Sequence, residues 1–141
     1  MKSTLGTCDV NCTHYQIMRS CATEKMPDIS LYDYIMRLLT HMNCSESCVV
    51  VAYIYIDRLK EIVSCTRYIN SLSIHRLFLV SMVIATKYCD DHSSDNTNYA
   101  YAGGVHVSEL NHMEVEFLFT VNFDLFITHT LFQAHYDDLI I

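Results

Sequence analysis

Two stretches between residues 72 and 126 are helical in pattern and apolar on nearly every side, and they constrain the fold more than any other part of the chain. The first stretch starts at Ile74 and contains a charged residue, Lys87, among its apolar residues. The second starts at Ser108 and contains the charged residue Glu114 in the same kind of surroundings. A helix that is apolar all round is either central in a core or covered by another molecule. A domain of 141 residues has room for about one central helix. We therefore expect the first stretch to form the centre and the second to need an outside partner.

Composition predicts an all-α fold in about one domain. The chain is 51% hydrophobic and has only 3 Gly and 1 Pro, which is unlike disordered segments and turn-rich β folds. Apolar residues at helical spacing predict a first helix that follows Ser30, which resembles a capping box with Asp33. Along the rest of the chain we expect a helix over 48–63 after Ser45 or Ser47, a helix from Ile74 to about Asp90 capped by Ser73, a loop over 90–98, one helical turn over 99–102, a bend at Gly103 and Gly104, a helix from Ser108 that ends between Phe123 and Phe126, and a short helix over 130–141.

The stretch 48–63 is the least obvious of these helices. Its β-branched residues, among them Val50, Val51 and Ile54, individually favour a strand. However, 16 residues without Gly, Pro or alternation are too long for an ordinary strand. We therefore predict a buried helix in which burial overrides the local preference.

Charge and cysteine content exclude several classes of protein. A net charge of −7, with 9 scattered Lys and Arg residues, would repel phosphate backbones, so we expect no nucleic-acid partner. The 7 cysteines form no regular framework, which favours reduced thiols inside the cell, in the nucleus or the cytoplasm. The apolar runs fall short of the roughly 18 residues that a membrane span requires, and the N-terminus has no apolar signal core. We therefore expect no membrane partner.

Charges on apolar helical faces need partners, because a lone buried ion costs several kcal/mol. Arg37 on the first helix and Asp57 on the second suggest a buried ion pair, with the alternative that Arg37 reaches water and Asp57 is solvated. Lys87 and Glu114 either bridge two helices or point together at the backbone of a partner protein. In the second case Tyr88, Leu118 and Phe123 would form the apolar floor around them.

Three segments carry a family likeness: YIYIDRL at 53–59, HRLFLVSMVIATKYCDD at 75–91 and SELNHMEVEFLFTVNFDLFI at 108–127. Together they resemble a cyclin box. Within the cyclins, residues 90–111 and the helix after them are most similar to the phosphate-response or P/U-type group, which carries a single box. The resemblance implies an N-terminal arm over 1–27, a five-helix cyclin box over 28–127 with a central third helix, and a short C-terminal helical extension over 128–141.

The resemblance also implies a function as the activating subunit of a cyclin-dependent protein kinase, which is not itself an enzyme. In the family, a Lys and a Glu bind the regulatory PSTAIRE-type helix of the kinase and nearby backbone, and Lys87 in IATKY and Glu114 in HMEVE match them. The matching apolar contacts are Tyr88, Leu118 and Phe123, and Asp91 or its neighbour lies near the kinase. The family's buried Arg–Asp pair corresponds to Arg37 and Asp57.

One departure concerns substrate docking. Cyclins that recruit substrates through a patch on the first helix carry Met, Ile, Leu and Trp there, but this chain has no Trp. Met36 and Leu39 remain, whereas Thr40 and Asn43 replace larger apolar residues. We therefore do not expect the chain to recruit substrates through this patch.

The sequence gives less support to a metal site, to an enzyme and to a transcription factor. Cys8, Cys12, His14 and Cys21 lack the spacing of a common zinc site, and the acidic loop after Asp90 lacks the pattern of a calcium-binding loop. Cysteines within apolar helices have raised thiol pKa values, which disfavours a cysteine hydrolase. We expect no cofactor, no metal ion and no small-molecule substrate. A transcription-factor-like binding module with the cyclin fold and no kinase partner is the alternative function.

Overall fold

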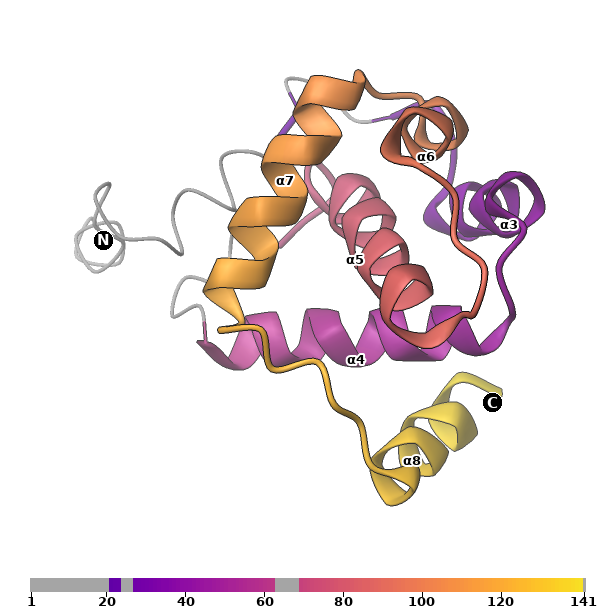
Figure 1. The fold of residues 1–141 in the computed structure, drawn as a ribbon, viewed down its shortest axis with the longest axis vertical. Helices are drawn as coiled ribbons and strands as arrows, with labels where there is room; N and C mark the ends of the chain where they lie inside the picture. Colours follow the sequence, from indigo (N-terminus) through magenta and orange to yellow (C-terminus); the bar gives the residue numbers. More distant parts are fainter. Residues whose placement is uncertain (1–20, 24–26, 63–68, 141) are drawn as a thin grey trace.

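The computed structural model describes residues 21–23, 27–62 and 69–140. Its described part is all-α, as the composition predicts, and no strand occurs there. Figure 1 shows the helices arranged around one central helix. In chain order they are α3 (Leu31–Met42), α4 (Ser47–Ile62), α5 (Ile74–Cys89), α6 (Asn96–Gly103), α7 (Val107–Thr120) and α8 (His129–Ile140).

Helix α5 lies at the centre, where the sequence placed the third helix (Figure 1). Every side chain from Leu77 to Thr86 is buried, because α3, α4, α6 and α7 all pack against α5. Burial ends abruptly at Lys87, so the last turn of α5 reaches the surface. Ser73 occupies the N-cap position but makes no side-chain capping bond to the helix, and its hydroxyl instead accepts from the Asn70 N–H at 3.1 Å.

Helix α4 forms despite its β-branched residues. Its buried residues include Val50, Val51 and Ile56, which lie on several sides of the helix, and this fits its position between α5 on one side and α8 on the other (Figure 1). Apolar burial of about 1.5–3 kcal/mol per large side chain outweighs a helix-propensity penalty of about 0.7 kcal/mol or less per residue. Before this helix, the Ser45 hydroxyl donates to the Asp90 carboxylate at 3.3 Å.

Helix α3 starts where the sequence predicted it. The Ser30 hydroxyl accepts a hydrogen bond from the Asp33 N–H at 3.1 Å, which satisfies a free amide of the first turn. Helix α3 packs against α6 and α5. The buried Tyr34 donates its hydroxyl to the Gly103 carbonyl at 2.6 Å, and this bond joins α3 to the end of α6.

Helix α6 is longer than the single turn expected over 99–102. It spans Asn96–Gly103, and the carboxylate of Asp95 accepts from the Asn98 N–H at 3.0 Å. The expected loop over 90–98 is therefore wrong at its end, since an Asp cap starts the helix within that polar run. The bend predicted at the two glycines is confirmed: Gly104 has a φ of 71°, and a Cβ on Gly103 would overlap Leu79 of α5.

Helix α7 begins one residue earlier than expected. The His106 ring accepts from the Ser108 N–H at 3.2 Å, and the Glu109 carboxylate accepts from the His106 N–H at the same distance. Helix α7 ends at Thr120, so the expected end between Phe123 and Phe126 is wrong, because the backbone leaves the helical conformation at Asn122. Asn122 and Phe123 follow with φ values of 57° and 55°, a conformation that few bulky residues adopt.

Helix α8 follows close to the position expected for the terminal helix and packs against α4. In Figure 1 it lies on the far side of α4 from the central helix. Within the described residues, none of the helices combines the length and the apolar character that crossing a membrane would require.

Candidate protein-docking site

Lys87 and Glu114 meet at the rim where the last turn of α5 reaches α7. The Lys87 Nζ atom lies 2.9 Å from Glu114 Oε2 and 3.1 Å from Oε1. The interpretation in which they bridge two helices is therefore correct for the isolated chain. The pair stays near the surface, because 35% of the Lys87 side chain and 15% of the Glu114 side chain are exposed.

Glu114 is held by a third helix as well. The Asn96 Nδ2 atom, in the first turn of α6, donates to Glu114 Oε1 at 2.8 Å and to Asn111 Oδ1 at 2.7 Å. Three helices therefore fix the orientation of one carboxylate. A carboxylate positioned in this way can accept a further hydrogen bond from a partner with little loss of side-chain freedom.

A shallow hollow lies beside the ion pair. It has a volume of about 190 Å³, and its lining residues are Ile84, Lys87, Tyr88, Glu114, Leu118 and Leu125. Four of the residues that the sequence assigned to partner binding are thus brought together. Tyr88 is 52% exposed, so its ring stands at the edge of the hollow with one side open to solvent.

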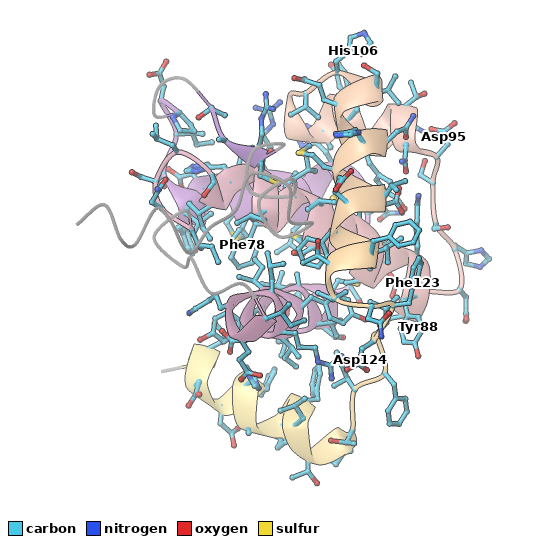
Figure 2. The ribbon with its side chains drawn as sticks, turned by 90° about the vertical axis from the view of Figure 1, so that its left-hand side faces the viewer. Phe78, Tyr88, Asp95, His106, Phe123 and Asp124 are labelled. Carbon is cyan, nitrogen blue, oxygen red and sulfur yellow. The ribbon has the colours of Figure 1, made fainter. Side chains whose placement is uncertain are left out.

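Phe123 extends this surface beyond the end of α7. It is 53% exposed, and Figure 2 shows it at the same end of α7 as Tyr88, opposite the end where His106 starts the helix. We call the surface formed by Lys87, Tyr88, Glu114, Leu118 and Phe123 the docking ledge. Asp91, the remaining predicted contact, is exposed in the loop after α5 and does not line the hollow.

Sequence reasoning missed several exposed apolar side chains next to the ledge. Val115 and Phe119 of α7 are 51% and 62% exposed, and Phe126 in the following linker is 67% exposed. The rings of Phe119 and Phe123 make an edge contact with centroids 5.2 Å apart. Val115 and Phe119 do not belong to the buried apolar face of α7. They are four residues apart, which is about one helical turn, and this spacing in the sequence could have indicated a second apolar face on the same helix.

The predicted buried pair of Arg37 and Asp57 is wrong. Arg37 is exposed, and its Nη2 atom lies 3.6 Å from the position that a Cβ on Gly104 would take. Asp57 instead lies 3.0 Å from the His135 ring nitrogen and 3.7 Å from Lys60 Nζ. The physical reason is the packing order: α3 packs mainly on α6 and α5, whereas the outer face of α4 packs on α8.

The described cysteines differ in acidity. Burial raises the pKa of the Cys21 thiol to about 12, as expected for a thiol in apolar surroundings, and partial desolvation raises the pKa of Cys89, which is exposed at the end of α5. Cys48 is an exception, because the hydrogen bond between the side chains of Cys44 and Cys48 lowers the pKa of Cys48 and raises that of Cys44. The described residues contain no group of His, Cys, Asp and Glu side chains able to hold a metal ion. Cys8, Cys12 and His14 of the zinc alternative lie outside the described residues.

Comparison with known proteins identifies the family. The sequence model of the cyclin family matches residues 2–125. The chain belongs to the cyclin family. The central α5 with other helices packed around it agrees with the expected all-α cyclin box.

Similar cyclins include plant proteins of the U and P types. The chain is 39% identical to Cyclin-U4-1 of Arabidopsis thaliana over 113 residues, which is 80% of this chain and 55% of that protein. It is 41% identical to Cyclin-U4-3 of the same plant over 77% of this chain and 49% of that protein. It is 39% identical to Cyclin-P4-1 of Oryza sativa subsp. japonica over 77% of this chain and 51% of that protein. The chain thus spans about half the length of the curated relatives it matches. Membership of this family supports a regulatory role for this cyclin.

Proposed function

We propose that this cyclin binds a cyclin-dependent protein kinase through the docking ledge and switches it on. The observation that carries the proposal is the ledge itself, an ion pair held by three helices and bordered by half-exposed aromatic rings. Exposed aromatic side chains around a fixed charge have the composition of a binding hot spot.

The chemistry of the ledge fits a helix and its flanking backbone as the bound element. The Lys87 ammonium has three donors and the Glu114 carboxylate several acceptor positions, and their mutual bonds leave part of this capacity free. Lys87 can therefore donate to a carbonyl of the kinase, while Glu114 accepts from an amide. The hollow of about 190 Å³ has room for an apolar side chain from the same element.

Activation follows from differential binding. A kinase needs its regulatory helix turned inward, so that the Glu of that helix pairs with the Lys that holds the ATP phosphates. The cyclin can shift the equilibrium of the kinase towards this inward state only by the difference between its binding free energies for the inward and outward states. An interface on the order of 2,000 Å² is expected for such a regulatory assembly.

The test is the affinity of the purified chain for a cyclin-dependent kinase. We expect Lys87→Ala and Glu114→Ala each to weaken binding at least tenfold, because each leaves an unpaired charge at a desolvated contact. Arg76→Ala is the matched control. Arg76 lies 3.5 Å from Glu109 and also joins α5 to α7, but in the first turn of each helix.

Two results would contradict the proposal. The first is a wild-type chain that does not bind the kinase. The second is a loss of affinity in Arg76→Ala as large as that in Lys87→Ala, with all variants equally folded, because it would show that the ledge has no special part in binding.

A further inference from the structure

Arg58 of α4 binds the linker between α7 and α8 by its backbone. Its Nη1 atom donates to the Asp124 carbonyl and its Nη2 atom to the Phe126 carbonyl, both at 2.7 Å. The side chain of Arg58 is only 19% exposed. Its carboxylate contact with Asp124 is longer, at 3.9 Å, and involves a side chain that is 71% exposed. The two carbonyl bonds are therefore the main attachment.

Tyr55 completes this attachment one turn earlier on α4. Its side chain is buried, and its hydroxyl donates to the Leu125 carbonyl at 2.9 Å. The guanidinium of Arg58 lies 6.0 Å from the centre of the Tyr55 ring, within the range of a cation–π contact. Two side chains of α4 thus bind three consecutive carbonyls, those of residues 124, 125 and 126. We call these three bonds the carbonyl clamp.

The linker needs such a restraint because its conformation is unfavourable by itself. Asn122 and Phe123 both have positive φ values; asparagine adopts this conformation readily, but it costs a residue with a bulky side chain such as Phe123 roughly 1–2 kcal/mol. The Phe123 N–H bonds to the Leu118 carbonyl at 2.9 Å and the Asp124 N–H bonds to the Val121 carbonyl at 3.1 Å; beyond this turn, the carbonyls of residues 124–126 are bound by side chains of α4. Leu125 and Ile127 of the linker pack against the core, whereas the rings of Phe123 and Phe126 are mostly exposed, so the positions of these two rings depend on the backbone that carries them.

The clamped linker is also the wall between two hollows. Leu125 lines the hollow of about 190 Å³ beside the ion pair. The same residue lines a larger hollow of about 700 Å³ between the start of α4, the end of α5 and α8, which also borders Phe126. Tyr88 lines both. Displacement of the linker would therefore change the shape of the ledge on this side.

We infer that Arg58 is a positioning residue for the proposed kinase contact: by binding the carbonyls of Asp124 and Phe126 it holds the linker so that the rings of Phe123 and Phe126 complete the docking surface. This inference rests on the proposed function. Arg58 need not touch the kinase, because its nitrogens are bonded to the linker of its own chain. Phe126, which lies outside the ledge, becomes a further contact residue.

The first test measures the clamp without the kinase. Amide hydrogen exchange in the linker, residues 121–128, is compared among the wild type, Arg58→Met and Arg58→Lys. Met keeps most of the apolar stem but cannot donate, and Lys donates from a single point that does not match two carbonyls as the guanidinium fork does. We expect exchange in the linker to rise at least tenfold in Arg58→Met and by less in Arg58→Lys. Exchange in the buried middle of α5 serves as the reference for global stability. Unchanged exchange in the linker would overturn the inference.

The second test measures kinase affinity of the same folded variants. We expect Arg58→Met to bind about tenfold more weakly, Arg58→Lys to recover part of the loss, and Phe126→Ala to reproduce much of it without change in linker exchange. Tyr101→Ala, which removes an 80% exposed ring on α6, is the matched control and should bind as the wild type does. If Arg58→Met lost affinity only in proportion to its unfolded fraction, Arg58 would be merely structural.

The two proposals fail in different ways. If the wild type binds the kinase and Arg58→Met binds equally well with a freed linker, the positioning role is overturned and the proposed function stands. If the wild type does not bind the kinase, both proposals are wrong, even where hydrogen exchange confirms that the clamp exists.

Discussion

The coupling free energy between Lys87 and Glu114 in the free chain tests the proposed docking role, because a small value indicates a surface pair and a large value indicates a pair that stabilises the interior of the fold. At the observed 2.9 Å, Coulomb's law gives about 1.4 kcal/mol in a water-like dielectric. The 35% exposure of Lys87 and the cost of ordering its long side chain reduce this value. We therefore expect a coupling free energy of about 0.5–1 kcal/mol in the free chain.

A double-mutant cycle measures this coupling. The free energy of unfolding is determined by urea denaturation for the wild type, Lys87→Ala, Glu114→Ala and the double variant. Glu114→Ala should cost more than Lys87→Ala, since it also removes the hydrogen bond from Asn96 at 2.8 Å. Glu114→Gln is the control that keeps an oxygen for Asn96 while it removes the charge.

A coupling free energy above about 3 kcal/mol would refute this reasoning, because only a pair with a buried character reaches that value. The two charges would then mainly stabilise the fold and would have little hydrogen-bonding capacity free for a partner. A small coupling together with cooperative unfolding of every variant would fit the surface geometry.

Three further predictions concern the stability of the fold and are measured as changes in the free energy of unfolding. Gly103→Ala should destabilise the chain by about 1–3 kcal/mol, because the added methyl group would overlap Leu79. Adding Leu79→Val to the Gly103→Ala variant should restore part of the lost stability. Unchanged stability in Gly103→Ala would contradict the close packing of Gly103 on Leu79. Ser30→Ala should cost about 1 kcal/mol through the bond to the Asp33 N–H, and a neutral result would show that another group caps α3. Burial raises the pKa of Tyr34 to about 12 from 10. Because the unfolded state loses this proton first, the stabilisation is complete below about pH 10, and up to about 3 kcal/mol is lost as the pH rises towards 12. Tyr34→Phe should therefore lose less stability than the wild type over that range, and an equal dependence of the unfolding free energy on pH in both proteins would contradict the raised pKa.

The local features of the sequence predicted the helices well. The apolar run around the whole of α5 identified the centre, because only a central position can bury every side chain from Leu77 to Thr86. Length decided correctly for α4, where single-residue preferences would have favoured a strand. The cap at Ser30 and the bend at the two glycines depend on contacts within a few residues or on backbone freedom, and both are visible in the sequence.

The features that the sequence did not predict depend on contacts between distant elements. Asp57 pairs with His135, which lies 78 residues away, and nothing near Asp57 indicates that α8 covers this face of α4. Asn96 orients Glu114 only because α6 starts earlier than expected. The linker carbonyls bind Arg58 and Tyr55, which lie more than 60 residues before them. Of the exposed rings in and beside the linker, the sequence therefore identified Phe123 but not Phe126.

The same contrast applies to the ledge. The sequence indicated which charges and rings belong together, since Lys87, Tyr88, Glu114 and Leu118 all line one hollow. It left open whether the two charges bind each other or a partner. The structure shows that they bind each other in the free chain, at a rim that stays open to solvent, and we propose that a kinase uses the same two groups.

The most direct measurement is the phosphotransfer activity of a purified cyclin-dependent kinase that is titrated with this chain. We predict that activity rises to a plateau, that Lys87→Ala shifts the midpoint at least tenfold to higher concentration, and that Arg76→Ala leaves the midpoint unchanged. A kinase whose activity stays at its basal level at every concentration of the chain, or a midpoint that is the same for all three proteins, would contradict the account.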